Sequence, residues 1–350
     1  MARELPGGEL MAGALRVGLI GAGANTRERH IPGFRMIADV EIVTVANRSQ
    51  TSSQQIATQY NIPRIAPDWQ SVIADPEVDA ICIGTWPYLH AEITVAALAA
   101  GKHVLTEARM ARNAEEAQKM FAAAMARPDL VAQVVPSPMT LPVDATITRY
   151  VSEGRLGKVR EVCVTHTTAA YADAFSPLTW RQDIELSGHN TLTLGIYYEA
   201  VLRWMDADAI VASAGAATNT SSRARADGSI ASVKIPDSLT VLASYPGGAR
   251  LVMHLSGVET GPPRNEIRIN GSLGGLRLEV ATSSLYWCPL VGQEEQVNIP
   301  ASEQGGWRVE ADFVNAIRTG SPVRLTDFAT GVRTMQFTDD VWRAWSERLA

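Results

Sequence analysis

An apolar run that ends in closely spaced glycines most constrains how this chain can fold. Residues 15–25 read LRVGLIGAGAN, which is typical of a buried strand followed by a tight turn. Glycines in such a turn let the chain bend sharply and bring backbone N–H groups close to a pyrophosphate. The third glycine position of the pattern holds Thr26, so the motif is imperfect. The segment predicts a nucleotide site built from Gly21, Gly23, Ala24, Asn25 and Thr26.

Apolar strands and helical segments alternate over the next hundred residues. VEIVTVA, VDAICIG and HVLTE are short apolar runs, and the segments between them, such as HAEITVAALAAG, have helical spacing. Gly101 would end that last helix. Strands that alternate with helices predict βαβ units around a parallel sheet. We therefore expect a dinucleotide-binding domain at residues 15–135, after a flexible leader at 1–14.

The pattern of apolar and polar residues changes after VVPSPMTLPVD, residues 134–144. The three prolines of this stretch indicate a domain junction. Beyond it, VREVCVTHTT and NEIRINGSLGGLRLEV alternate apolar and polar residues between turn signals, which is typical of antiparallel sheet with one covered face. TLGIYYEAVLRWM has the pattern of an amphipathic helix, and two more helices are expected near the end of the chain. We assign residues 136–350 to a second domain, whose last helices pack back on the first.

Composition excludes several classes of function. The chain has 31 basic and 37 acidic residues and a formal net charge of −6, so no basic excess favours nucleic acid or an acidic membrane surface. Its three cysteines are widely spaced, and neither a metal site nor a disulfide framework is expected. The sequence contains no apolar run typical of a signal peptide or a membrane span. We expect a cytoplasmic protein that binds neither nucleic acid nor membrane.

The end of the second predicted strand bears on the choice of cofactor. An NAD site usually has an acidic residue there, which binds the ribose hydroxyls. This chain has Asn47, Arg48 and Ser49 instead. A guanidinium beside short polar groups suits a 2′-phosphate, through forked hydrogen bonds. These three residues predict that NADP is preferred to NAD, although a solvated loop arginine is the alternative interpretation.

Motifs along nearly the whole chain resemble those of the glucose–fructose oxidoreductase/inositol dehydrogenase/MocA family. They are VGLIGAGA, TWPYLHAE, AGKHVLTEARM, SEGRLGKV, WRQDIELSGHNTLTLGIYYEAVLRW and INGSLGGLRL. The resemblance implies an N-terminal Rossmann domain and a C-terminal α/β domain with a large, mainly antiparallel open sheet. It also implies NAD(P)-dependent chemistry on sugars, cyclitols and related polyols. Assembly into a homodimer or homotetramer through that sheet would follow.

The resemblance further implies which residues line the cofactor. Thr85, Trp86 and His90 match a family motif that follows the fourth strand, with Trp86 in place of the usual proline. Glu107 matches the glutamate of the family's Glu-Lys-Pro motif. Trp180-Arg181 resembles a Trp-Arg pair that reaches the cofactor in some NADP-dependent members of the family.

The catalytic set departs from the family pattern. Ala108 replaces the lysine of Glu-Lys-Pro and Arg109 replaces its proline, while Thr193 and Tyr197 stand where an aspartate and a histidine are usual. Alanine cannot handle a proton, and arginine stays protonated and is a poor base. Tyr197 is then the best proton donor or acceptor left.

Other residues have two open interpretations. Arg109 is either a site cation or a surface salt-bridge partner. His189 either contacts substrate or is structural, and His166 or Tyr171 could join Tyr197. We therefore expect Tyr197, Arg109, His189 and Thr193 to form the catalytic set.

These observations predict an NAD(P)-dependent oxidoreductase that acts on a sugar, cyclitol or related polyol by hydride transfer. Two alternatives remain open. One is an enzyme that retains its cofactor and uses transient oxidation to drive elimination or glycoside cleavage. The other is a non-catalytic nucleotide-binding sensor or partner subunit.

Overall fold

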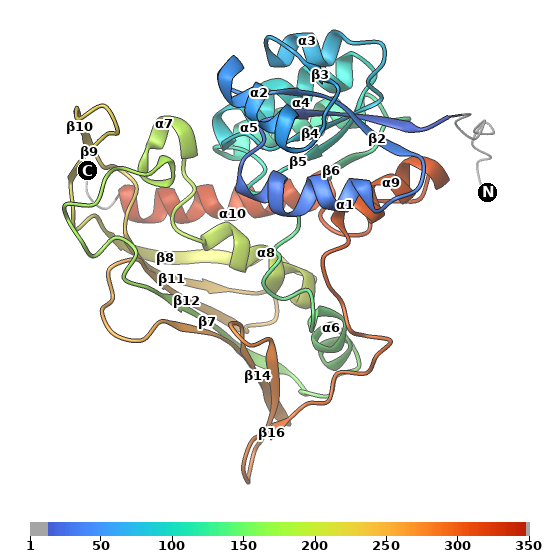
Figure 1. Ribbon diagram of the computed structural model, residues 1–350. Helices are drawn as coiled ribbons and strands as arrows, with labels where there is room; N and C mark the ends of the chain where they lie inside the picture. Colours follow the sequence, from blue (N-terminus) through green and yellow to red (C-terminus); the bar gives the residue numbers. More distant parts are fainter. Residues whose placement is uncertain (1–12, 348–350) are drawn as a thin grey trace. The chain divides into compact units, whose positions relative to one another are not determined.

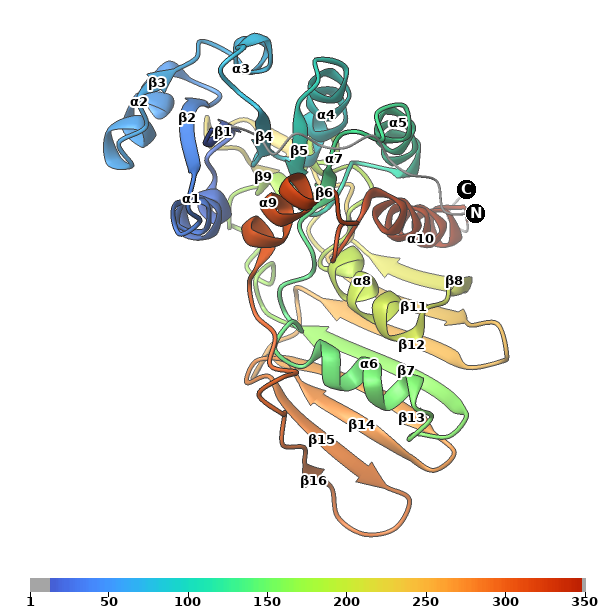
Figure 2. The same cartoon turned by 90° about the vertical axis from the view of Figure 1, so that its right-hand side faces the viewer.

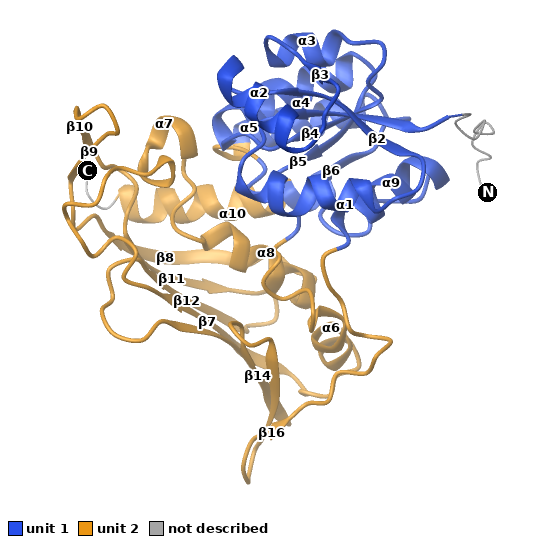
Figure 3. Cartoon of the chain, viewed as in Figure 1, with its two compact units in different colours: residues 1–110, 115–136, 308–331 blue, residues 111–114, 137–307, 332–350 orange. Residues whose placement is uncertain are grey.

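The computed structural model describes residues 13–347 and divides into two compact units. Unit 1 comprises residues 1–110, 115–136 and 308–331, and unit 2 comprises residues 111–114, 137–307 and 332–350 (Figure 3). Of the flexible leader expected at residues 1–14, residues 1–12 lie outside the described part of the chain.

Unit 1 is built on a six-stranded parallel sheet. Its strand order is β3-β2-β1-β4-β5-β6, which is the order of a Rossmann fold. The apolar runs form its central strands because a parallel sheet covered on both faces buries whole runs of side chains. The strands are β1 (Leu15–Ile20), β2 (Val40–Ala46), β3 (Arg64–Ile65), β4 (Ala80–Ile83), β5 (His103–Thr106) and β6 (Ala132–Val134). The predicted parallel sheet is confirmed.

Helices connect these strands (Figure 1). The turn after β1 leads into a π-helix, Thr26–His30, and then α1 (Ile31–Arg35). The other connecting helices are α2 (Gln50–Gln59), α3 (Trp69–Ala74), α4 (His90–Ala99) and α5 (Ala114–Met125), and unit 1 also contains α9 (Val309–Thr319). Although α9 comes from the far end of the sequence, it packs against α1 in unit 1.

Unit 2 contains an eight-stranded mixed sheet. Its order is β16-β15-β14-β13-β7-β12-β11-β8, and every neighbouring pair is antiparallel except β7 with β12. This confirms the large, mainly antiparallel sheet. The strands are β7 (Val159–Thr167), β8 (Ile210–Ala217), β11 (Ser238–Ser244), β12 (Arg250–Ser256), β13 (Arg264–Gly271), β14 (Gly274–Glu279), β15 (Ser284–Pro289) and β16 (Glu295–Gln296). A separate hairpin pairs β9 (Ser222–Ala224) with β10 (Ile230–Ser232).

Helices α6 (Asp144–Ser152), α8 (Leu194–Met205) and α10 (Phe328–Ser346) supply the apolar side chains that cover this sheet. Figure 2 shows α6 and α8 on one face of it. A short helix, α7 (Ile184–Ser187), precedes α8. The core between helices and sheet includes Ile147, Tyr198 and Phe337 against Val162 and Leu239. None of the helices in the described part of the chain has the length and apolar character needed to span a bilayer.

Candidate active site

The glycine turn after β1 lies tightly against the loop after β4. Gly21 has a φ of +83°, and a Cβ atom there would lie 2.7 Å from the backbone N of Thr85. A Cβ atom on Gly84 would lie 2.1 Å from the carbonyl oxygen of Gly21. Gly23 is different, because its nearest neighbour would be 3.4 Å away. Gly21 and Gly84 therefore allow two loops to meet, whereas Gly23 leaves open backbone beside them.

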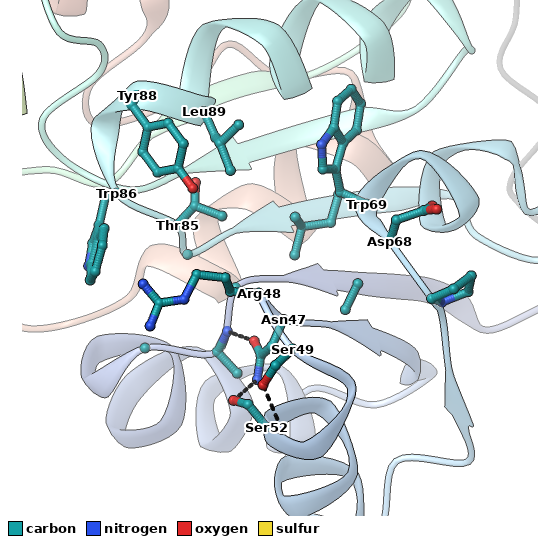
Figure 4. Close-up of a pocket in the computed structure, with 17 residues that line it drawn as sticks. Asn47, Arg48, Ser49, Ser52, Asp68, Trp69, Thr85, Trp86, Tyr88 and Leu89 are labelled. Carbon is teal, nitrogen blue, oxygen red and sulfur yellow. Dashed lines mark hydrogen bonds between the residues drawn. The ribbon is translucent and has the colours of Figure 1, made fainter. Parts of the chain in front are cut away.

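A cavity of about 410 Å³ opens beside this turn. It lies where the strand order reverses between β1 and β4, the usual place for a ligand in a doubly wound sheet. Its lining includes seven of the residues predicted to bind the cofactor: Gly21, Gly23, Asn47, Arg48, Ser49, Thr85 and Trp86. Asp68, Trp69, Tyr88 and Leu89 also line it (Figure 4). Five other predicted residues of unit 1, Ala24, Asn25, Thr26, His90 and Glu107, are not in its lining.

Asn47 and Ser49 hold the cavity wall in place. The Asn47 side-chain oxygen accepts a hydrogen bond from the backbone N–H of Ala22 at 2.7 Å, and its Nδ2 donates to Ser52 at 3.0 Å. Ser49 caps the N-terminus of α2, because its Oγ accepts from the backbone N–H of Ser52 at 3.2 Å. These side chains fix the glycine turn and the start of α2.

Arg48 supplies the cation of this cavity. Its guanidinium carbon lies 5.4 Å from the ring centroid of Trp86, within range of a cation–π interaction. Figure 4 shows the side chain extending toward Trp86. Asp68, a carboxylate of the lining, accepts a hydrogen bond from the backbone N–H of Ser71 at 2.7 Å and so caps α3.

Thr26 explains why the third glycine can be absent. The residue is 1% exposed, and its hydroxyl donates to the carbonyl oxygen of Gly21 at 3.1 Å. The threonine thus fills the space behind the turn and joins the π-helix to the turn after β1.

Glu107 belongs to a buried ionic network. One of its oxygens accepts from Asn25 Nδ2 at 2.5 Å and lies 2.9 Å from His30 Nε2. His30 Nδ1 lies 2.5 Å from a carboxylate oxygen of Glu310, at the start of α9. Gly33 makes room for this carboxylate, since a Cβ atom there would lie 2.4 Å from it. One imidazole therefore bridges two carboxylates.

The pKa values of His30 and Glu107 favour the charged form of both side chains. Burial alone would lower the pKa of His30, but the hydrogen bonds and charges of Glu107 and Glu310 outweigh it and raise the pKa to about 9. Burial opposes ionisation of Glu107, but the hydrogen bond and charge of His30 lower its pKa. Sequence reasoning missed His30 and Glu310, which are 280 positions apart; a histidine just after the glycine turn was the one available signal.

His90 and Arg109 are also buried in unit 1. The ring nitrogens of His90 lie 3.0 Å from the carbonyl oxygens of both Thr85 and Arg109, so the ring holds the loops after β4 and β5. Burial lowers the pKa of His90. The side chain of Arg109 is 7% exposed. Arg109 is therefore not at the surface of unit 1.

Tyr197 lies at the centre of a polar cluster in unit 2. The residue is 0% exposed, and its hydroxyl donates to Asn265 Oδ1 at 2.5 Å and lies 3.0 Å from His166 Nδ1. Thr193 is one turn earlier, and its carbonyl oxygen accepts from the backbone N–H of Tyr197 at 3.1 Å. In the described part of the chain, the buried hydroxyl of Thr193 makes no hydrogen bond. Burial raises the pKa of the Tyr197 phenol above its usual range.

The remaining predicted residues of unit 2 lie in other surroundings. His189 Nδ1 lies 2.7 Å from Asp339 Oδ1, and its ring stacks on Trp342 with centroids 4.6 Å apart. These contacts favour the structural interpretation of His189. Arg181 lies over the ring of Trp180, 4.4 Å from its centroid. Across residues 13–347, no group of three His, Cys, Asp or Glu side chains is arranged to hold a metal ion.

The six-stranded parallel sheet and the glycine-lined cavity give unit 1 the form of a Rossmann domain with a cavity at the usual nucleotide position. Two models of one family match the chain: "Oxidoreductase family, NAD-binding Rossmann fold" at residues 15–134 and "GFO/IDH/MocA C-terminal domain" at residues 145–277. The chain therefore belongs to the Gfo/Idh/MocA family of oxidoreductases, as the sequence motifs predicted.

Several named proteins are similar in sequence. Levoglucosan dehydrogenase of Pseudarthrobacter phenanthrenivorans is 31% identical over 185 residues, which is 51% of this chain and 47% of that protein. 1,5-Anhydro-D-fructose reductase of Ensifer adhaerens is 38% identical over 31% of this chain and 32% of its own length. Trans-1,2-dihydrobenzene-1,2-diol dehydrogenase of Sus scrofa is 25% identical over 83% of this chain and 80% of that protein. The matches to the first two thus span half or less of those enzymes.

Solved structures show the same fold at low identity. Levoglucosan dehydrogenase in complex with NADH and levoglucosan has a TM-score of 0.84 at 22% identity, covering 95% of this chain and 98% of that one. A 3-ketoreductase from Actinomadura kijaniata with bound NADP has a TM-score of 0.77 at 19% identity, with coverage of 95% and 98%.

Proposed function

We propose that this chain is an NADP(H)-preferring oxidoreductase that acts on a sugar, cyclitol or related polyol. The observation that carries the cofactor preference is Arg48 in the wall of the cavity, at the end of a strand where an NAD site usually has an acid. The open backbone at Gly23 fits a pyrophosphate. A bound nicotinamide cofactor would supply the hydride acceptor or donor.

Arg48 is the residue proposed to select the 2′-phosphate. Its guanidinium lies against Trp86, which holds it at the cavity wall and leaves its N–H groups able to donate to an anion. Asn47 and Ser49 support this role indirectly, because their hydrogen bonds fix the backbone on either side of Arg48.

Calorimetric titration with NADP(H) and NAD(H) tests the preference. We expect NADP(H) to bind more tightly, and Arg48→Ala to weaken NADP(H) binding by about 1.5–3 kcal/mol through loss of a charged hydrogen bond. NAD(H) binding should change much less. Asp68→Asn is the matched control, since it removes a charge from the same cavity without removing a phosphate donor. Equal or tighter binding of NAD(H) by the wild type would contradict the preference.

Tyr197 is the group proposed to exchange a proton with the substrate oxygen. Support comes from its place on α8, from its hydrogen bonds to two polar side chains and from the unpaired hydroxyl of Thr193 one turn away. The names of the sugar-acting relatives support the substrate class. Thr193 is proposed to contact a substrate hydroxyl, and Arg109 to supply positive charge near the reacting oxygen.

Tyr197→Phe keeps the ring and removes only the hydroxyl. We expect kcat to fall by about 10²–10⁴-fold, the usual contribution of a positioned proton-transfer group. Folding and NADP(H) affinity should change little. Steady-state kinetics with a turned-over polyol and calorimetry of the same variant measure both. Wild-type turnover in Tyr197→Phe would rule out the assignment.

A further inference from the structure

The apolar face of the unit 2 sheet becomes polar at one end. On β7, Val162 and Val164 point into the core beneath the helices, and His166 is the next residue on that face. On β13, Ile267 and Ile269 do the same, and Asn265 precedes them on that face, next to Arg264, the first residue of the strand. His166 and Asn265 are direct partners in the antiparallel register. His166 and Asn265 thus place two adjacent polar side chains on a face where the other positions of the same strands carry Val and Ile.

Tyr197 reaches both of these side chains from α8. Its hydroxyl donates to Asn265 Oδ1 at 2.5 Å, with His166 Nδ1 at 3.0 Å, and the two rings have centroids 5.2 Å apart. A phenol has one proton and two acceptors here. Rotation about the C–O bond moves that proton from Asn265 to His166 without displacing any heavier atom. The geometry therefore suits transfer of the phenolic proton to the imidazole.

We propose that His166 is a positioning residue that exchanges a proton with Tyr197, so that the two form a relay from the substrate oxygen to the end of β7. The inference rests on the proposed function of Tyr197 and adds the group that takes up the proton. Asn265 holds the phenol in place while its proton is on the Asn265 side.

Protons and electron pairs balance in this relay for both alcohol oxidation and carbonyl reduction. In alcohol oxidation the substrate O–H bond breaks, its proton goes to the phenolic oxygen of Tyr197, and the phenolic proton goes to Nδ1 of neutral His166. The electron pair of the broken O–H bond stays on the substrate oxygen and enters the new carbonyl bond. The C–H bond of the same carbon breaks as well, and its electron pair would leave as hydride to a bound nicotinamide cofactor, the acceptor named in the proposed function. In reduction, Tyr197 protonates the substrate oxygen and His166 returns a proton to the phenol.

The surroundings of Tyr197 explain why its phenol needs a second group that takes up the proton. Burial raises the pKa of the phenol, so a lone phenolate at Tyr197 would be costly. Burial also lowers the pKa of His166, and the hydrogen bond with Asn265 offsets only part of this. Both shifts oppose an imidazolium–phenolate pair, so the phenolic proton passes to His166 only as the phenol receives the proton of the substrate.

Other charged and titratable groups lie near His166 at this end of the sheet. Next to Asn265 on β13, Arg264 pairs with Glu259 at 2.7 Å, and His254 on β12 lies 3.7 Å from the same carboxylate. Strand alternation directs Arg264 and His254 to the face opposite His166. On the core face, β12 places Leu255 beside His166, and α8 contributes Tyr197. The pH response of His166 should therefore follow burial, Asn265 and Tyr197.

Nitrogen-15 NMR of the histidine side chains in the full chain tests the shared proton without any turnover. We expect Tyr197→Phe to shift the titration of His166 and the protonation of its Nδ1, and to leave His254 unchanged. An identical His166 titration in both proteins would overturn the relay.

Kinetics of His166→Gln supply the second test. We expect kcat to fall by about 10²-fold, the acid limb of the pH profile for oxidation to disappear and KM to change little. In His166→Ala, added imidazole should restore part of kcat. His254→Gln, on the opposite face of the neighbouring strand, is the control and should behave as wild type. A His166→Gln profile with its acid limb intact, or no imidazole rescue, would overturn the relay.

The two tests separate the relay from the function on which it rests. If the wild type transfers no hydride, the proposed function fails, and the NMR titration alone then decides whether Tyr197 and His166 share a proton. If Tyr197→Phe loses turnover while His166→Gln does not, the proposed function stands and the relay is wrong.

Discussion

Ala108 is the residue at which the sequence motifs predict the clearest departure from the family pattern. It is half-buried between Glu107 and the buried Arg109. Glu107 is already paired with His30, so a lysine at position 108 would meet a neighbouring cation and a carboxylate that is already engaged. Burying a charge without a partner is costly. We therefore expect Ala108→Lys to leave kcat on the native substrate unchanged or lower.

Ala108→Met is the matched control for this substitution, because it adds similar length without charge. Steady-state kinetics of both variants separate the effect of size from that of charge. A large gain in kcat for Ala108→Lys alone would indicate that the chain retains a site built for lysine and has only lost the residue.

Single residues also show the limit of sequence reasoning. Seven residues of the nucleotide cavity could be predicted because they follow strands that the apolar pattern identifies, whereas Asp68, Trp69, Tyr88 and Leu89 of the same lining were not predicted. The hydrogen bonds of Asn47 could not be predicted, since they depend on where Ala22 and Ser52 lie in space. For Tyr197, the sequence indicates His166 as a possible neighbour but not Asn265, because the two residues come from strands that pair only in the fold.

At the scale of elements, His30 joins the π-helix after β1 to the end of β5 and the start of α9. Its pKa is raised from 6.5 to about 9. The stabilisation is therefore fully present below about pH 6.5 and is lost as the pH rises through about 9. For Glu107, whose pKa is lowered, the contribution is present at neutral pH and is lost on acidification.

Chemical denaturation at about pH 7 and about pH 10 measures this linkage. We expect the wild type to lose on the order of 3 kcal/mol of unfolding free energy between these conditions because of His30. His30→Gln should be less stable at about pH 7, because two buried carboxylates lose their cation, and should lack this part of the pH dependence. The same pH dependence in both proteins would mean that His30 is not the group responsible.

Elements differ in how far the sequence predicts them. The patterns indicate α4, α8, α9 and the central strands because apolar spacing and end signals agree there. Helix α6 is not indicated, since four of its nine residues, Thr146, Ile147, Thr148 and Val151, are β-branched and weak helix formers. It forms because Ile147 and Tyr150 pack in the core of unit 2. Strand β6 has only three residues, too few for a pattern.

At the scale of the whole molecule, the proposed reaction draws on both units. The nucleotide cavity and Arg48 belong to unit 1, and Tyr197 with its polar cluster belongs to unit 2. A nucleotide-binding sensor would need only the first. An oxidoreductase needs both, because hydride transfer from carbon must be accompanied by proton transfer from oxygen.

Hydride transfer itself is the most direct test of this account. Wild-type protein is incubated with NADP⁺ and a panel of sugars, cyclitols and other polyols, each deuterated at the oxidisable carbon, and the reduced cofactor is analysed by absorbance and mass spectrometry. We predict net formation of NADPH that carries deuterium at C4 of the nicotinamide ring with at least one of these polyols. Product formed without net reduction of the cofactor, or no transfer of deuterium from any member of the panel, would contradict the account.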